Sequence, residues 1–176
     1  MSSHRADTSR RTLVARTFGL KGDAWMRHAN PVSVWTRFAV LPLLVLSIWS
    51  RDWIGWWCLL PVAASIAWLL VNPLFFPPPT STRNWASKGV LGERIWTERD
   101  RSSLPPQFRS AAPNVAQTFQ VVGMVPLVVG LVVLEPVAVV LGVLIVQVGK
   151  CWFIDRMVLL FDAMKATDPE VAAWDF

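Results

Sequence analysis

The sequence predicts an all-α, polytopic membrane protein made of two transmembrane helical hairpins, four spans in all. Apolar residues form 53% of the 176-residue chain, above the roughly 45–50% of soluble domains. They concentrate in two blocks, 38–71 and 119–161. Each block is too long for one crossing of about 20 residues and suits two. Only helices satisfy every backbone polar group in lipid without a closed barrel, so the blocks are predicted to be helical.

Each block is interrupted once. The first breaks at Ser50-Arg51-Asp52, which predicts helices at about 34–50 and 54–71, within a hairpin over 31–76. The second breaks at Glu135-Pro136, which predicts helices at about 117–134 and from 137 onward, within a hairpin over 117–160. The alternative is a soluble bundle of buried helices, but no run shows the polar face of a surface helix.

Three further segments flank the hairpins. Residues 1–30 form a basic arm that mixes Arg with apolar residues, which favours partial contact with the membrane surface. The connection 77–116 follows "NPLFFPPP", whose prolines end a helix, and contains "STRNWASKGVLGERIW", a predicted interfacial helix. Gly89 and Gly92 weaken that helix, so it needs packing against the membrane or the bundle. Residues 161–176 form a tail.

The basic residues predict an orientation. Of the 17 Lys and Arg residues, only Arg51 lies at a predicted hairpin tip. The positive-inside rule therefore places both termini in the cytoplasm and the protein in the inner (plasma) membrane. Trp residues cluster near both predicted membrane surfaces, as interfacial anchors do. The pI near 10 then indicates attraction to anionic lipids and not to nucleic acid.

Glycines predict how two of the helices pack. Gly123 and Gly130 in one helix, and Gly142 and Gly149 in the next, are each seven residues apart. Small residues at such spacing allow close helix contact. The simpler reading is a seam between these two helices. The other is a small oligomeric channel or transporter, although the tip half of the spans has almost no polar residue to line a path.

A polar stripe runs along the last predicted helix. At about 100° per residue, Gln147, Lys150, Asp155, Asp162 and Lys165 share one face. A stripe that enters a span usually faces protein or a water-filled cavity. We therefore expect Asp155 and Asp162 to face inward and meet a cation from another segment. The expected cations, in order, are Arg37, Arg94 and Lys88.

The other helix ends deliver polar residues to the same depth, the predicted cytoplasmic boundary. These groups either cap helices and grip headgroups, or form a shallow site for a headgroup, quinone or small anion. The candidate ligand-binding residues are Arg37, Asp155, Arg94, Glu93, His28, Asn30 and Asn84.

No catalytic motif or metal-ligand spacing is visible, and the sequence indicates no particular cofactor. Cys58 and Cys151 differ in depth by about 15 Å in the predicted topology, too far for a disulfide. The leading interpretation is a non-enzymatic accessory or scaffolding subunit, or a lipid or small-molecule binder, with a membrane-protein partner or a second copy. The alternative is an enzyme acting on an amphiphile, with Asp155 or Glu93 as acid or base and Arg37 or Arg94 holding an anionic group.

Four segments carry a resemblance. "HANPVSVWTRF", "NPLFFPPP", "NWASKGVLGERIW" and "WFIDRMVLLFDAM" together resemble a family of small prokaryotic four-helix integral-membrane proteins of unknown function. These segments cover about half of the chain, at the predicted cytoplasmic ends of the helices. The resemblance implies a membrane protein and no particular activity.

Overall fold

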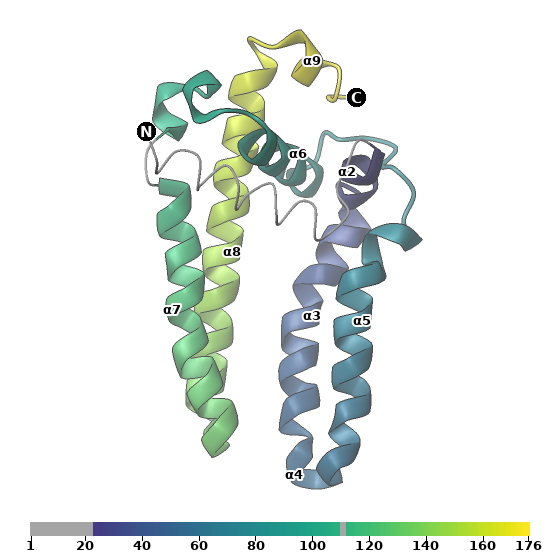
Figure 1. Ribbon diagram of the computed structural model, residues 1–176, viewed down its shortest axis with the longest axis vertical. Helices are drawn as coiled ribbons and strands as arrows, with labels where there is room; N and C mark the ends of the chain where they lie inside the picture. Colours follow the sequence, from purple (N-terminus) through teal and green to yellow (C-terminus); the bar gives the residue numbers. More distant parts are fainter. Residues whose placement is uncertain (1–22, 110–111) are drawn as a thin grey trace. The chain divides into compact units, whose positions relative to one another are not determined.

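The computed structural model describes residues 23–109 and 112–176, and every regular element in that part is helical (Figure 1). The predicted all-α class is confirmed. The elements are α2 (Asp23–His28), α3 (Pro31–Trp49), α4 (Arg51–Ile54), η1 (Gly55–Cys58), α5 (Leu59–Phe75), α6 (Trp85–Glu98), η2 (Arg101–Ser103), η3 (Pro106–Phe108), α7 (Ala112–Val133), α8 (Pro136–Lys165) and α9 (Pro169–Ala172).

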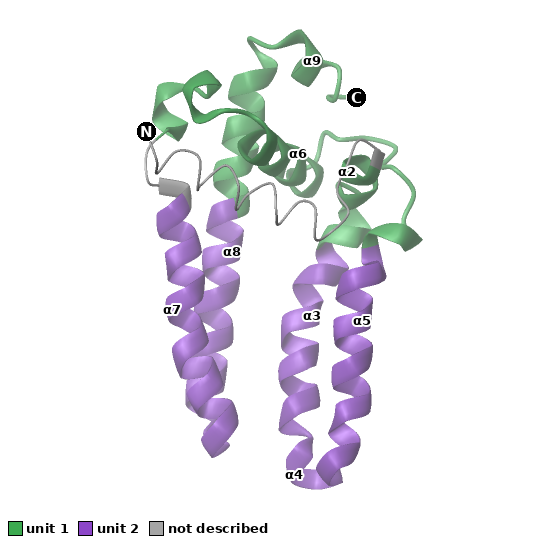
Figure 2. Cartoon of the chain, viewed as in Figure 1, with its two compact units in different colours: residues 1–34, 73–113, 154–176 green, residues 35–72, 114–153 purple. Residues whose placement is uncertain are grey.

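The chain divides into two compact units (Figure 2). Unit 1 comprises residues 1–34, 73–113 and 154–176, and unit 2 comprises residues 35–72 and 114–153. The boundaries fall within the long helices. Thus α8 contributes its first part to unit 2 and its last part, from Ile154, to unit 1.

Unit 2 contains the apolar helices. In Figure 1, α3 lies beside α5 and α7 lies beside α8. Three helical segments of the described chain are long and apolar enough to cross a membrane: Pro31–Phe75, Asn114–Val133 and Pro136–Lys165. The first has 45 residues and includes the chain reversal at α4 and η1. The structure is therefore that of an all-helical protein with membrane-spanning character.

The first tip is longer than predicted. The helix expected to begin near 54 begins at Leu59, because α4 and η1 occupy residues 51–58. Gly55 has φ +56°, a left-handed conformation that ends α4. The last helix also extends beyond the predicted hairpin end at 160 and continues to Lys165.

The predicted glycine seam is confirmed. A Cβ added at Gly130 would lie 2.7 Å from the backbone nitrogen of Val139, and one at Gly142 would lie 2.5 Å from that of Leu127. A Cβ at Gly123 would meet the side chains of Ile145 and Val146, and one at Gly149 would meet Gln120 of α7. Backbones this close leave no room for side chains, so these glycines are accounted for by the packing of α7 on α8.

Unit 1 has an apolar core of its own. Trp25 of α2, Leu91 and Ile95 of α6, and Leu160 and Phe161 of α8 are each at most 2% exposed. The glycines of α6 permit this packing. A Cβ on Gly92 would overlap the carbonyl group of Met157, and one on Gly89 would overlap the side chain of Ile154. The packing that the glycine-weakened helix was predicted to need is supplied by α8.

Candidate functional site

Six of the seven predicted site residues belong to unit 1, and the seventh, Arg37, belongs to unit 2. Arg37 is half-buried in α3, where its backbone carbonyl lies 3.5 Å from Lys150 Nζ. The ammonium of Lys150 also lies 4.1 Å from the centre of the Phe38 ring, a cation–π contact. Lys150 of the polar stripe is therefore held against α3 by protein groups.

Asn30 and Asn84 cap helices. Asn84 Oδ1 accepts a hydrogen bond from Ser87 N at 2.9 Å, and its Nδ2 donates to Ser87 Oγ at 2.9 Å. Asn30 Oδ1 accepts from Val32 N at 3.0 Å, and its Nδ2 donates to Pro77 O at 3.0 Å. Each amide satisfies an otherwise unbonded N–H at a helix start. Both residues thus fix the entry of the chain into a helix.

The segments that carry the family resemblance meet in unit 1. Ser87 Oγ donates to Ala29 O at 2.7 Å, which ties the start of α6 to the "HANP" segment. The Asn30 bond to Pro77 ties the same segment to the triple proline. On the other side of α6, Gly89 and Gly92 contact Ile154 and Met157 of the "WFIDRM" segment.

Arg94 belongs to a chain of contacts across unit 1. Its Nε donates to Glu98 Oε2 at 3.0 Å, and its guanidinium lies 4.3 Å from the centre of the Trp174 ring. Glu98 Oε1 in turn accepts from the indole nitrogen of Trp25 at 2.7 Å. The Arg94 side chain is only 17% exposed. These contacts link α2, α6 and the tail. The planar, charged side chain of Arg94 therefore has a structural role in unit 1.

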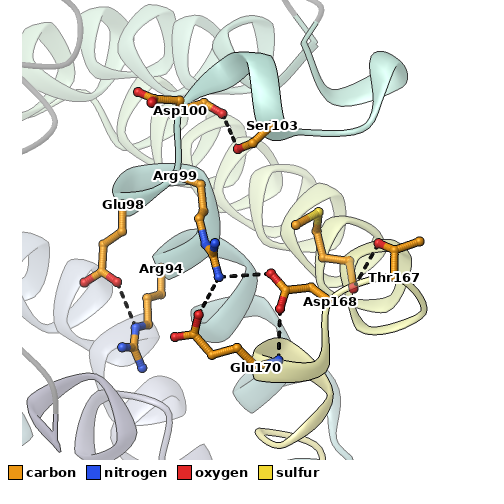
Figure 3. A network of polar contacts seen from close by, with 9 residues as sticks. Arg94, Glu98, Arg99, Asp100, Ser103, Thr167, Asp168 and Glu170 are labelled. Carbon is orange, nitrogen blue, oxygen red and sulfur yellow. Dashed lines mark hydrogen bonds and ion pairs between the residues drawn. The ribbon is translucent and has the colours of Figure 1, made fainter.

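A second cation, Arg99, was not among the predicted site residues (Figure 3). One of its amino groups, Nη2, lies 3.0 Å from Asp168 Oδ2 and 2.7 Å from Glu170 Oε2. Asp168 also caps α9, because its Oδ1 accepts from Glu170 N at 2.9 Å. The sequence signal was the Asp-Pro-Glu at 168–170, a helix start in the tail.

His28 and Glu93 lie in the same unit. The ring of His28 meets Trp25 edge to face, with centroids 6.0 Å apart. Glu93 is half-buried on α6. Among the residues that the structure describes, no three or more His, Cys, Asp or Glu side chains converge as metal ligands would.

The stripe on α8 behaves differently at each position. Asp162 does meet a cation from another segment, since Lys88 Nζ lies 2.8 Å from its Oδ1. Lys88 was the third of the three expected partners. Lys165 pairs with Asp175 at 2.8 Å. Gln147 Nε2 donates to Phe38 O at 2.9 Å.

The prediction that Asp155 faces inward is wrong. Asp155 is exposed and has no ion pair with any described residue. The reason is the face that α8 buries in unit 1. Its buried residues lie on the opposite side of the helix from Asp155, at about 100° per residue. They are Met157, Leu160, Phe161 and Met164.

The tail is fastened to the segment after the prolines. Thr82 N donates to Phe176 O at 2.8 Å, and Thr82 Oγ1 donates to Trp174 O at 2.6 Å. The hydrogen bond from Lys165 lowers the pKa of Asp175 below its ordinary value. Asp175 is therefore held ionised, and its charge helps to close the tail over unit 1.

The fold and site define a class: an all-helical protein of membrane-spanning character, with a polar unit built from the helix ends and the tail. A family model for DUF6653, a family of unknown function, matches residues 9–175. The chain belongs to this family. No curated protein and no solved structure matches the chain.

Proposed function

We propose that the protein crosses the inner membrane four times with both termini in the cytoplasm. The 45-residue segment Pro31–Phe75 would reach about 68 Å as one straight helix, more than twice a hydrocarbon core of about 30 Å. Its reversal at residues 50–58 supports two crossings. Because Arg51 is the only Lys or Arg of the two tips, the positive-inside rule supports cytoplasmic helix ends on the other side.

Reporter insertions test this topology in the full chain. A reporter inserted after Asp100 or fused after Phe176 should report the cytoplasm, and one inserted after Trp53 should report the opposite side. Asp100 and Trp53 are both exposed, so the insertions disturb little. A cytoplasmic signal from the position after Trp53 contradicts the four-span arrangement.

We further propose that the protein is a non-enzymatic accessory or scaffolding subunit, with α5 as the surface for a membrane-protein partner. One observation carries this proposal. Only 6% of the most apolar window of Pro31–Phe75 is buried within the chain, compared with 28% for each of the other two segments. Within this segment it is α5 that is open, because Asn72 is its one buried residue, whereas α3 buries residues such as Val34, Phe38 and Val45. The helix α5 therefore keeps most of its surface free for other membrane components.

The chemistry of α5 supports a helical partner. Ala63 and Ala67, four residues apart, are both exposed on this helix, as is Ala64. Without a hydrophobic driving force in lipid, transmembrane helices associate where small residues let the backbones approach. Unit 1 would then have a structural role, because Asn30, Asn84 and Arg94 all form hydrogen bonds within it.

Purification of the full chain in a mild detergent tests this proposal. Wild type should retain a second chain, either another membrane protein or a second copy, in a fixed ratio. Ala67→Trp should abolish this retention and leave the melting temperature unchanged, because the side chain is exposed. The matched control is Val129→Trp on α7. This position is also exposed (53%), but valine is not one of the small residues that let helix backbones approach. A wild-type protein that purifies alone, or equal retention by both variants, contradicts the proposal.

A second candidate function is the binding of anionic lipid headgroups at the cytoplasmic face. Its supporting observation is Arg156, whose Nε is buried without a hydrogen-bond partner in the described chain. Five further Lys or Arg residues lie in residues 1–22. Juxtamembrane basic residues attract anionic leaflets. Arg156→Gln should lower the affinity for vesicles containing phosphatidylglycerol, and an unchanged affinity would exclude this role for Arg156.

A further inference from the structure

A pocket of about 360 Å³ lies in unit 2, between the tip of the first hairpin and the end of α7. Its lining combines charge and apolar surface: Arg51, Asp52, Gly55, Trp56, Cys58 and Leu134. None of these residues was among the predicted site residues. Since the pocket is at the far end of unit 2 from the ends of α3 and α8 that enter unit 1, it is separate from the candidate site described above.

Arg51 is positioned by the last turn of α7. Its Nη2 donates to the carbonyls of Leu131 and Val132, the latter at 3.0 Å. These carbonyls belong to the helix end, where no intrahelical donor remains and where a cation is favoured. Nε and Nη1 of Arg51 have no hydrogen-bond partner among the described residues. The guanidinium is thus fixed in place and keeps donors available for an anion.

Asp52 supplies the opposite charge next to it. The carboxylate is exposed and has no ion pair with any described residue. Trp56, which also lines the pocket, is 84% exposed. The face of an indole attracts organic ammonium groups. The pocket therefore offers donors for a phosphate, together with a carboxylate and an aromatic face for an amine.

The surroundings indicate an amphiphile. Trp53 and Trp57 at the same tip are 72% and 73% exposed, and such Trp residues lie at the headgroup level of a bilayer. The tip also borders an apolar groove of about 390 Å³ whose lining includes Trp49, Trp53 and Val140. The charged pocket suits the phosphate of a phospholipid, and the apolar groove suits its acyl chains.

We propose that the pocket between the two tips binds the headgroup of a zwitterionic, amine-bearing phospholipid. The phosphate would accept a charge-assisted hydrogen bond from one of the remaining donors of Arg51, Nε or Nη1. The ammonium would face Asp52 and Trp56. This binding goes beyond the proposed scaffolding function, and it holds for whichever leaflet surrounds the tips.

Native mass spectrometry of the purified full chain tests the proposal. The probes are phosphatidylethanolamine and phosphatidylglycerol with the same acyl chains, and glycerophosphoethanolamine, which has none. Wild type should retain phosphatidylethanolamine over phosphatidylglycerol, and it should not retain the chainless compound. Asp52→Asn should lower the retention of phosphatidylethanolamine about two- to fivefold, the size of a solvent-exposed ion pair, and abolish the preference. Retention of phosphatidylglycerol should not change.

Arg51→Gln should weaken the retention of both lipids, since both carry the phosphate. Arg51→Gln also removes the contact to α7 and is interpreted only if the variant folds. Asp52→Asn leaves the α7 contact in place and keeps the test decisive. Asp100→Asn, an exposed change in unit 1, is the control and should match wild type. Equal retention of the two lipids by wild type overturns the proposal. So does a preference that survives Asp52→Asn, tight binding of glycerophosphoethanolamine, or a dimer that excludes lipid.

Discussion

Gln147 of α8 donates a hydrogen bond from its Nε2 to the backbone carbonyl of Phe38 in α3, at 2.9 Å. In an uninterrupted α-helix, the carbonyl of Phe38 would accept from the N–H four residues later. That residue is Pro42, inside α3, which has no N–H. Lipid cannot supply the missing donor, so a neighbouring helix must. Gln147 therefore compensates for the proline and joins the two hairpins of unit 2.

This relationship predicts that Gln147 and Pro42 are coupled. Gln147→Leu leaves the Phe38 carbonyl without a donor and should destabilise the protein by about 1–2 kcal/mol. In a Pro42→Ala background, the helix itself regains the donor, so the same change should cost close to nothing. Thermal unfolding of the four proteins in one detergent measures the coupling free energy.

Gln120→Leu, on α7 and partly buried, is the matched control and should show no coupling to Pro42→Ala. Additive effects of Gln147→Leu and Pro42→Ala would mean that the carbonyl is satisfied in another way.

The helices could be predicted from the sequence, but the faces of one helix could not. Apolar runs broken at Ser50–Asp52 and Glu135–Pro136 located the hairpins, because length and hydropathy alone constrain a chain in lipid. The inward face of α8 in unit 1 depends on which helix packs there. Gly92 brings α6 against Met157, and this contact turns Asp155 outward. A periodicity gives the angle between residues, and only the packing partner gives the direction.

The sequence identified several residues of the candidate site, but it did not predict what each of them does there. Asn30 and Asn84 stood before predicted helices, which is a capping signal, and the structure shows both as caps. The partner of Arg94, by contrast, includes Trp174, eighty positions along the chain. The sequence assigned Arg51 only to a hairpin tip. Its hydrogen bond to the end of α7 is a tertiary contact, which the sequence pattern does not reveal.

Asp162 should matter more than Asp155. Lys88 and Asp162 are 22% and 40% exposed, so their ion pair is partly solvated and worth about 0.2–1 kcal/mol. Asp162→Asn should lower stability by that amount, and Lys88→Met should remove the effect. Asp155→Asn should change stability by less than about 0.5 kcal/mol, as an exposed substitution does. Unfolding in detergent that shows the larger loss for Asp155→Asn would contradict the exposed position of this residue.

Gly92→Ala distinguishes packing from helix propensity by its sign. Propensity alone predicts that Ala stabilises a helix by about 0.8–1 kcal/mol over Gly. The contact predicts the reverse, because the new Cβ would overlap the Met157 carbonyl, which is backbone and cannot rotate away. We expect destabilisation of about 1–3 kcal/mol. Thr97→Ala on the same helix adds no atom and is the control. A more stable Gly92→Ala protein would show that α6 does not pack on α8 in this way.

The tail should loosen in acid through one ion pair. Lys165 Nζ lies 2.8 Å from Asp175 Oδ2, and this hydrogen bond is the main cause of the lowered pKa of Asp175. Nearby Arg83 and Lys88 act in the same direction, and burial opposes them.

A carboxyl group whose pKa is lower in the folded state stabilises that state above the unfolded pKa, here 3.8. The stabilisation is lost as the pH falls from that value through the folded pKa. Hydrogen exchange of the amides of residues 172–176 between about pH 5 and pH 2 should therefore show protection that falls about two- to fivefold below pH 3.8, after correction for the intrinsic exchange rate. Asp175→Asn should show no such step. Lys165→Met should have lower protection at pH 5 and a smaller step, since the pKa of Asp175 then returns toward its ordinary value. A step of equal size in all three proteins would assign the acid sensitivity to another group.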